Sequence, residues 1–114
     1  MSRNLSLKAK FSPLHQIDSG DIDATYMGIG YALERPARIV WMQNYTDGFL
    51  YFSQDGIEDH LALPSLAHTV IDLTANRSNM DAAWSFEQGS RFYVRHDGSA
   101  PTDGAAFISY LYAE

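Results

Sequence analysis

Four histidines are the only side chains of the sequence that offer nitrogen ligands of the kind transition metals prefer: His15, His60, His68 and His96. A strong metal site places such ligands at close spacing, and the chain has no cysteine to add a thiolate. His60 and His68 come nearest to a pair, but they are well separated in sequence. We therefore predict isolated or hydrogen-bonded histidines and no metal centre.

Three carboxylates lie close together in one stretch that is rich in turn residues: Asp18, Asp21 and Asp23. Flexible loops with many oxygen ligands suit calcium. The stretch lacks the spacing and the terminal glutamate of an EF-hand loop, and Asp and Gly also fill turns for backbone reasons. We expect an ordinary turn here, with calcium as the alternative.

No pattern for catalysis is complete. Glu58 and Asp59 resemble the acid pair of a glycosidase, but adjacent residues on a strand point to opposite faces. Gly28 and Gly30 form a fragment of a phosphate-binding pattern that lacks its third glycine and its following helix. There is also no Gly-x-Ser-x-Gly elbow. We predict that the protein is not an enzyme and binds no cofactor.

The charge balance argues against nucleic acid as a partner. The sequence has 14 acidic and 8 basic side chains, a formal net charge of −6, whereas a general nucleic-acid binder needs a basic footprint. Arg3, Lys8 and Lys10 precede every acidic residue, which gives either a mildly basic arm or ordinary solvated strand faces. The first residues, 1–11, lack the apolar stretch of a signal peptide, and no run is long enough to span a bilayer. We expect synthesis in a cytoplasm and no membrane partner.

The elements that must position these residues are strands, because the dominant apolar period is two. Val, Ile, Tyr, Phe and Trp fill the apolar runs, as suits a pleated surface. The predicted strands cover residues 5–11, 27–33, 39–42, 49–52, 67–74, 91–95 and 105–112. The runs at 39–42 and 49–52 are continuous, as expected for strands covered on both faces.

Turn signals separate these runs. Asp-Gly occurs four times, at Asp47, Asp55, Asp97 and Asp103, and is a strong signal for a reversal. The first pair predicts a hairpin in which residues 44–47 pair with Phe52 and Ser53, and the second predicts another reversal directly after it. About seven to nine short antiparallel strands indicate an all-β sandwich, jelly-roll or immunoglobulin-like, in a single domain spanning residues 1–114.

Two stretches do not fit the strand pattern. Residues 12–23 predict a loop with at most a short strand, and residues 77–88 a long loop with Trp84 and Phe86 as anchors. The second stretch also has the composition of one capped helical turn. Trp84 is the best candidate for contact with a neighbouring subunit, the alternative being a ring folded back over the core.

Several further residues could form a contact surface. Tyr110 and Tyr112 share one face of the last strand, and if Phe107 and Leu111 form the core, the two tyrosines point outward. If the strand lies between two layers, all four are core. An extended arm over residues 1–11, carrying Lys8 and Lys10, could add a strand to a neighbour, or it could be an edge strand of its own sheet.

From Gln43 onward the order of short motifs resembles a family of small structural proteins of tailed-bacteriophage virions. The matching motifs are Gln43-Asn44-Tyr45-Thr46-Asp47, Phe52-Ser53, Asp55-Gly56, Asp59-His60, Leu63-Pro64, Ile71-Asp72-Leu73-Thr74 with Asn76, Gln88-Gly89, Arg91-Phe92-Tyr93-Val94, Ala100-Pro101-Thr102-Asp103-Gly104 and Phe107-Ile108-Ser109. The likeness does not extend to residues before Arg38 or to the loop 77–87.

This resemblance implies a virion structural protein, either a collar subunit at the head–tail connector or a capsid decoration protein. Its implied partners are other copies of itself, as a homo-oligomer, and the portal, neck, tail or capsid proteins. It carries over no catalytic residues. The alternative from the residues themselves is a carbohydrate-binding sandwich module, in which Tyr and Trp rings stack on sugars and Asp and Asn accept hydroxyl hydrogen bonds.

Overall fold

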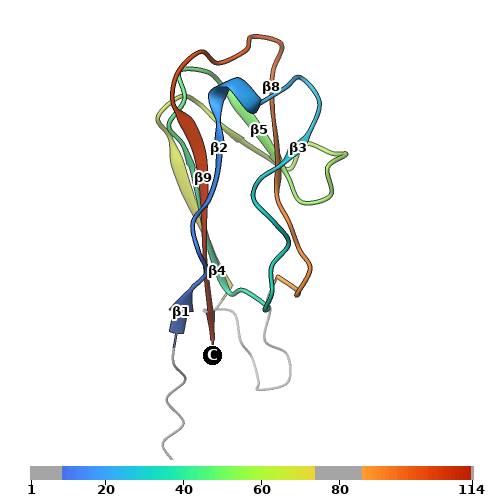
Figure 1. The fold of residues 1–114 in the computed structure, drawn as a ribbon, viewed down its shortest axis with the longest axis vertical. Helices are drawn as coiled ribbons and strands as arrows, with labels where there is room; N and C mark the ends of the chain where they lie inside the picture. The colour runs from blue at the N-terminus through green and yellow to red at the C-terminus, as the bar shows by residue number, and fades with distance from the viewer. Residues whose placement is uncertain (1–8, 74–85, 114) are drawn as a thin grey trace, which may run out of the picture.

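The computed structural model describes residues 9–73 and 86–113, which form two antiparallel sheets (Figure 1). Sheet A has the order β1-β9-β4-β7, with β2 also paired to β9, and sheet B has the order β3-β8-β5-β6. The strands of sheet A are β1 (Ala9–Phe11), β2 (His15–Asp18), β4 (Ile39–Asn44), β7 (His68–Asp72) and β9 (Ala105–Ala113). Those of sheet B are β3 (Met27–Gly28), β5 (Leu50–Ser53), β6 (Leu61–Leu63) and β8 (Tyr93–His96). A 3-10 turn, η1 (Ser19–Asp21), follows β2.

The pairing of the strands is nested. β2 pairs with β9, β3 with β8, β4 with β7 and β5 with β6, and all four pairs are antiparallel. The chain is thus a long antiparallel ribbon rolled up so that successive pairs fall alternately into sheet A and sheet B. This is the topology of a jelly roll. The predicted all-β sandwich is confirmed, in its jelly-roll form.

The core lies between the two sheets. In β4, Val40 and Met42 are buried while their neighbours are half-buried, and in sheet B the side chains of Leu50, Phe52 and Val94 are fully buried. The alternation follows from the pleat, which sends successive side chains to opposite faces. The expectation that the run 39–42 is covered on both faces is therefore wrong, because only its even residues lie in the core.

The predicted hairpin between β4 and β5 is also wrong. The two strands belong to different sheets, since β4 pairs with β7 and β9 whereas β5 pairs with β6 and β8. The connection through Asp47 therefore crosses from one layer to the other instead of closing a hairpin. The Asp55-Gly56 turn does reverse the chain within a sheet, between β5 and β6. A turn signal predicts where the chain bends, but not which strand it will pair with afterwards.

A single buried side chain holds the crossing from β4 to β5 in place. The Asn44 amide nitrogen donates to the carbonyl oxygens of Gly48, Leu63 and Pro64, at 2.9 to 3.1 Å. Its amide oxygen accepts from the backbone and the hydroxyl of Thr46, at 3.0 and 2.6 Å. Asn44 is fully buried, so these bonds satisfy polar groups that water cannot reach. The end of β4 is thereby tied to the end of β6 in the opposite sheet.

The start of the described chain belongs to its own sheet. β1 pairs with the last residues of β9, so residues 9–11 form an edge strand as one of the two predicted alternatives. The short strand allowed within residues 12–23 is β2. The predicted strand 27–33 is shortened to β3, although Ile29 and Leu33 do reach the core. In the part of the chain that the structure describes, no helix has the length and apolar character needed to cross a membrane.

Candidate functional site

The outer face of sheet A carries an apolar surface that the fold itself does not bury. It consists of Phe11, Ile39, Trp41, Val70, Phe107 and Leu111, and we call it the sheet A outer face. All six side chains point away from the core, because they alternate along their strands with buried or core-facing residues. An antiparallel sheet that faces water usually presents polar side chains there. The register also places the polar residues Gln43, His68, Asp72 and Ser109 on this side of sheet A, so the face is mixed, with the six apolar side chains standing among polar ones.

The strand register brings these side chains together. Between β4 and β7, Trp41 lies opposite Val70. On the other side of β4, Ile39 lies opposite Leu111 of β9, and Leu111 lies opposite Phe11 of β1. The rings of Phe11 and Trp41 are 5.5 Å apart. Phe11 remains 58% exposed and Val70 45% exposed, and the partly buried Trp41 lies beside both of them. Exposed apolar side chains that lie together are a mark of an interaction site.

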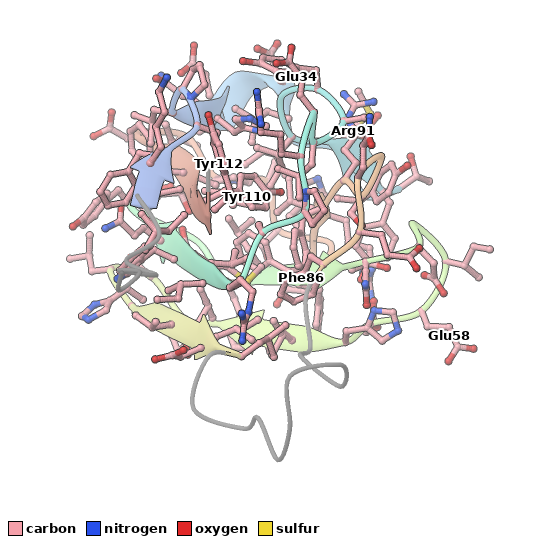
Figure 2. The ribbon with its side chains drawn as sticks, turned by 90° about the horizontal axis from the view of Figure 1, so that it is seen from below. Glu34, Glu58, Phe86, Arg91, Tyr110 and Tyr112 are labelled. Carbon is pink, nitrogen blue, oxygen red and sulfur yellow. The ribbon has the colours of Figure 1, made fainter. Side chains whose placement is uncertain are left out.

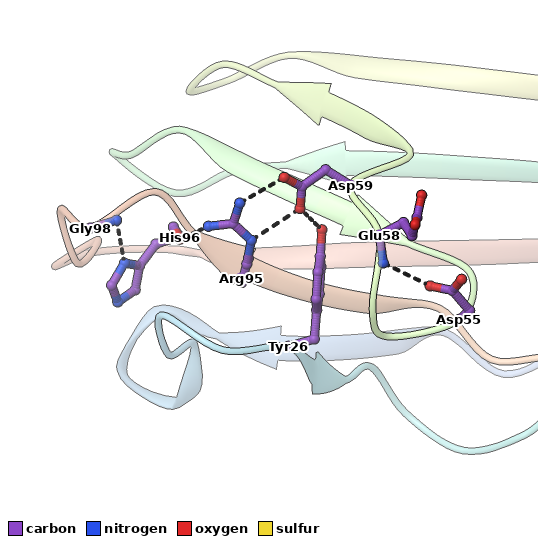
Figure 3. A network of polar contacts seen from close by, with 7 residues as sticks. All are labelled: Tyr26, Asp55, Glu58, Asp59, Arg95, His96 and Gly98. Carbon is purple, nitrogen blue, oxygen red and sulfur yellow. Dashed lines mark hydrogen bonds and ion pairs between the residues drawn. The ribbon is translucent and has the colours of Figure 1, made fainter.

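The outer side of sheet B has a different chemistry (Figure 3). Arg95 donates two hydrogen bonds to Asp59, from Nε at 3.1 Å and from a terminal nitrogen at 2.7 Å, and Tyr26 donates its hydroxyl proton to the same carboxylate. The guanidinium of Arg95 also lies 4.5 Å from the ring centre of Tyr51. The network joins the loop before β6 to β8 and to the segment before β3.

These contacts fix the protonation of the network. The hydrogen bond from Arg95, with that from Tyr26, holds the pKa of Asp59 below its ordinary value. Burial and the hydrogen bond to Asp59 raise the pKa of Tyr26 to about 12. Neither group changes charge near neutral pH, so the network has no acid or base available for proton transfer. The network holds the loop before β6, the strand β8 and the segment before β3 together through polar contacts.

The loop between β5 and β6 is ordered by one aspartate. Asp55 accepts hydrogen bonds from the backbone of Ile57 and Glu58 and from the Ser53 hydroxyl, at 2.8 to 3.0 Å. These bonds, led by the one from Glu58, lower the pKa of Asp55 to about 2. The Asp59 carboxylate, which the sequence pairs with Glu58, is bound by Arg95 through two hydrogen bonds. The loop holds Ile57 in solvent, 80% exposed.

A pocket of about 110 Å³ opens where the start of β2 and the connection before it meet β9 and the segment after β3. It is lined by Ser12, Pro13, His15, Tyr31, Leu33, Glu34, Arg35 and Tyr112. Figure 2 looks onto the end of the molecule where Tyr112 and Glu34 lie. The guanidinium of Arg35 stands 5.6 Å from the ring centre of Tyr112. The pocket can hold one small polar group beside an aromatic ring.

His15 forms the inner wall of this pocket. Its side chain is 1% exposed and lies between Tyr31 and Tyr110, with ring centres 4.7 and 4.9 Å away. Within the described residues neither ring nitrogen has a hydrogen-bond partner. Burial lowers the pKa of His15 from its ordinary 6.5. The Ile29 backbone partly opposes this effect, and the charge of Arg91 makes a smaller contribution that also lowers the pKa. The imidazole is therefore neutral at pH 7.

The positions of the predicted contact residues differ from the prediction. Tyr110 is fully buried, so the expectation that it faces outward is wrong. The alternative that all four residues are core is also wrong, because Phe107 and Leu111 are only partly buried. The reason is the parity of β9: Ala106, Ile108 and Tyr110 face sheet B, whereas Phe107 and Leu111 face outward.

Of the remaining predicted contact residues that the structure describes, Lys10 of β1 and Tyr112 of β9 lie opposite each other. Tyr112 is half-buried at the pocket. Phe86 packs against Phe92 at 5.5 Å between ring centres, so it is an anchor on the core. Lys10 is exposed on β1. Trp84 and Lys8 lie outside the described residues.

The histidines and carboxylates that were considered as metal ligands are not grouped in the described part of the chain. Over residues 9–73 and 86–113, no three His, Asp or Glu side chains are grouped so that they could hold a metal ion. His60 and His96 each use Nδ1 to accept a backbone hydrogen bond, from Gln54 and Gly98, at 3.0 Å.

Sequence reasoning missed the sheet A outer face, the buried ring of His15 in the wall of the pocket, and the hydrogen-bonding role of Asn44. The outer face had a signal, since Ile39, Trp41, Phe107 and Leu111 are the odd residues of two apolar runs whose even residues are also apolar. Such runs predict strands with two apolar faces, but only the strand order shows which face meets the other sheet. The roles of His15 and Asn44 had no local signal, because their neighbours come from distant parts of the chain.

Comparison with known proteins gives no match to any model of a protein family, to any curated protein or to any solved structure. The assignment of function therefore depends on the chain's own surfaces.

Proposed function

We propose that this chain is a non-enzymatic structural subunit of a tailed-phage virion, which associates with copies of itself and with neighbouring virion proteins. The observation that carries the proposal is the apolar sheet A outer face. The motif resemblance from Gln43 onward and the jelly-roll topology, which recurs in viral capsid domains, support the same assignment.

The energetic argument starts from what the fold requires. A two-layer sandwich is stable when each sheet buries one face, and here the inner faces already supply the core. The side chains of Phe11 and Val70 lie outside that core and leave apolar area in water, and the partly buried Trp41 lies beside both. Burying such area contributes about 25 cal/mol per Å² on association. A neighbouring subunit that covers this face gives these side chains the burial that the isolated sandwich does not.

Assembly subunits act through shape complementarity and need no reactive groups. The Tyr26–Asp59–Arg95 network fits this role, because its charges are compensated and it stiffens the opposite face. A stiff body with one apolar face is suited to meeting identical neighbours in a closed symmetric assembly. The proposal covers three positions in the particle: the collar, the head–tail connector and the capsid surface.

The test compares two aromatic residues on opposite outer faces. Light scattering of the purified protein should give the mass of an oligomer, and Trp41→Gln should weaken association at least tenfold, because it removes the largest ring of the apolar face. Tyr51→Gln, on the outer side of sheet B, should leave the mass unchanged. Immunoblots of purified phage particles should detect the wild-type chain and lose it with Trp41→Gln. A strictly monomeric protein that is absent from particles would refute the proposal.

The pocket at His15 favours a second candidate, carbohydrate binding. Tyr112 and Tyr31 offer rings, and Glu34 and Arg35 offer a hydroxyl acceptor and a donor. Saccharide binding on a glycan array that disappears with Tyr112→Ala, together with a monomeric mass, would select this candidate over assembly.

A further inference from the structure

The edges of the two sheets are not equivalent. In sheet B the outermost strands are β3 and β6, which are only two and three residues long. On one side of sheet A, β1 and β2 are separated by a segment that contains Pro13, which has no amide proton to donate. Short strands and proline are the usual means by which proteins protect a sheet edge. Among the described strands β7, at the other side of sheet A, is the longest edge strand, with five residues and no proline.

Two backbone hydrogen bonds show which way the polar groups of β7 point. The Asn44 amide donates to the Ala67 carbonyl at 2.9 Å, and the Leu73 amide donates to the Arg38 carbonyl at 2.8 Å. In an antiparallel pair the direction of the backbone groups alternates along the strand. The odd residues of β7 therefore face β4, and the even residues, including His68 and Val70, direct N–H and C=O away from it.

The side chains of the same even residues lie on the sheet A outer face. Val70, at the centre of β7, is 45% exposed beside Trp41. His68 and Asp72 flank it two residues away on either side, and both are exposed. If β7 meets a second β7 antiparallel about Val70, each His68 stands opposite Asp72 of the second copy. An acid and a base opposite each other on paired strands stabilise the pairing.

We infer that β7 pairs antiparallel with β7 of a second copy about a two-fold axis at Val70, so that the two A sheets become one continuous sheet. This inference deepens the proposed self-association and rests on it. Val70 pairs with its counterpart through outward-pointing backbone groups, and the two apolar outer faces adjoin across the axis. A carboxylate has two oxygens, so the His68 contact is compatible with the interaction that Asp72 makes within its own chain.

A single cysteine tests this register, because the natural chain contains none. Directly opposed residues in a hydrogen-bonded antiparallel pair have Cα atoms about 5.5 Å apart, within the range of a disulfide. Val70→Cys should therefore form a disulfide-linked dimer nearly completely under mild oxidation. His68→Cys is the matched control on the same strand. Its two cysteines would be separated by four residues, about 13 Å, which is too far for a disulfide.

Val70→Pro gives a second test that spares the fold. The Val70 amide points away from β4, so the proline removes a donor only at the outer edge. We expect a circular dichroism spectrum like that of the wild type and association weakened at least tenfold, measured by analytical ultracentrifugation. His68→Glu should weaken association by opposing two carboxylates, and adding Asp72→Lys should restore it.

The outcomes separate this inference from the proposed function. A wild-type oligomer in which Val70→Cys does not cross-link, or cross-links no better than His68→Cys, would overturn the pairing and leave self-association standing. A monomeric wild-type protein would overturn the pairing itself. A Val70-linked dimer that never enters phage particles would support the pairing and count against the virion role.

Discussion

At the scale of single residues, the chain keeps several polar groups in its interior without partners among the described residues. His15, Arg91 and Tyr110 all have buried nitrogen or oxygen atoms of this kind. Burial favours the uncharged forms of His15 and Tyr110, which lowers the pKa of the first and raises that of the second. Both residues pack as rings, and a buried polar atom without a partner costs stability.

His15 should make stability depend on pH near neutrality. Its folded-state pKa lies below 6.5, so the unfolded chain takes up a proton first as the pH falls. The free energy of unfolding should therefore decrease from pH 7.5 to pH 5.5, and urea denaturation at several pH values measures this. His15→Phe should remove most of that dependence while changing stability at pH 7.5 by no more than about 1 kcal/mol. An equal dependence in both proteins would assign the effect to another group.

At the scale of elements, the connections between strands determine the topology as much as the strands do. Most of the Asp-Gly turns serve crossings between the layers, and Gly104 lies directly before β9 with a φ of +89°. A Cβ atom there would overlap the carbonyl oxygen of Tyr45 at the end of β4. The close approach lets the start of β9 join β4 in the register that the rest of the sheet follows.

Gly104→Ala should be one of the most damaging small substitutions in the chain. It combines a left-handed backbone with a clash against main chain, so we expect a loss of about 3 kcal/mol or more in urea denaturation. Gly98→Ala is the matched control, because Gly98 also has a positive φ but nothing within 4 Å of a Cβ atom. It should lose about 1 to 2 kcal/mol, the cost of the backbone strain alone. Similar losses in the two variants would show that the approach to Tyr45 is not tight.

At the scale of the whole molecule, the two sheets depend on one shared core. Phe52 of sheet B and Met42 of sheet A are both fully buried in the same cluster. Neither sheet can lose its partner without exposing that cluster to water. Unfolding is therefore expected to be a single transition.

Phe52→Ala tests this coupling. Removing a buried ring from sheet B should cost about 3 to 5 kcal/mol and should destabilise sheet A equally. With Trp84→Phe as the background, Trp41 is the only tryptophan and reports on sheet A by fluorescence. Its transition in urea should coincide with that of the circular dichroism signal, before and after Phe52→Ala. A fluorescence transition that keeps its midpoint while the circular dichroism midpoint falls would mean that the sheets unfold separately.

How much the sequence predicts depends on how local the physical cause is. Alternating side chains and Asp-Gly turns act over a few residues, so most of the extended segments, the turns between them and the all-β class could be predicted. The three-residue strand β6 (Leu61–Leu63) is not among the predicted strands, because it is too short to show an apolar period. The strands that pair with β4 could not be predicted from the sequence. Asp47 and Gly48 specify a bend after β4, but they do not specify which distant strand accepts the hydrogen bonds of Asn44. The same limit applied to β9, where two apolar faces competed for the core.

The sequence by itself determined that this protein is built of short strands around an apolar interior, since pleat and turn chemistry are local. Only the tertiary structure decided which side of each apolar strand remained outside, because that depends on the nested pairing of strands far apart in the chain. It buried Tyr110, left Trp41 and Val70 on the surface, and placed β7 at an edge. The surfaces proposed for assembly follow from that selection.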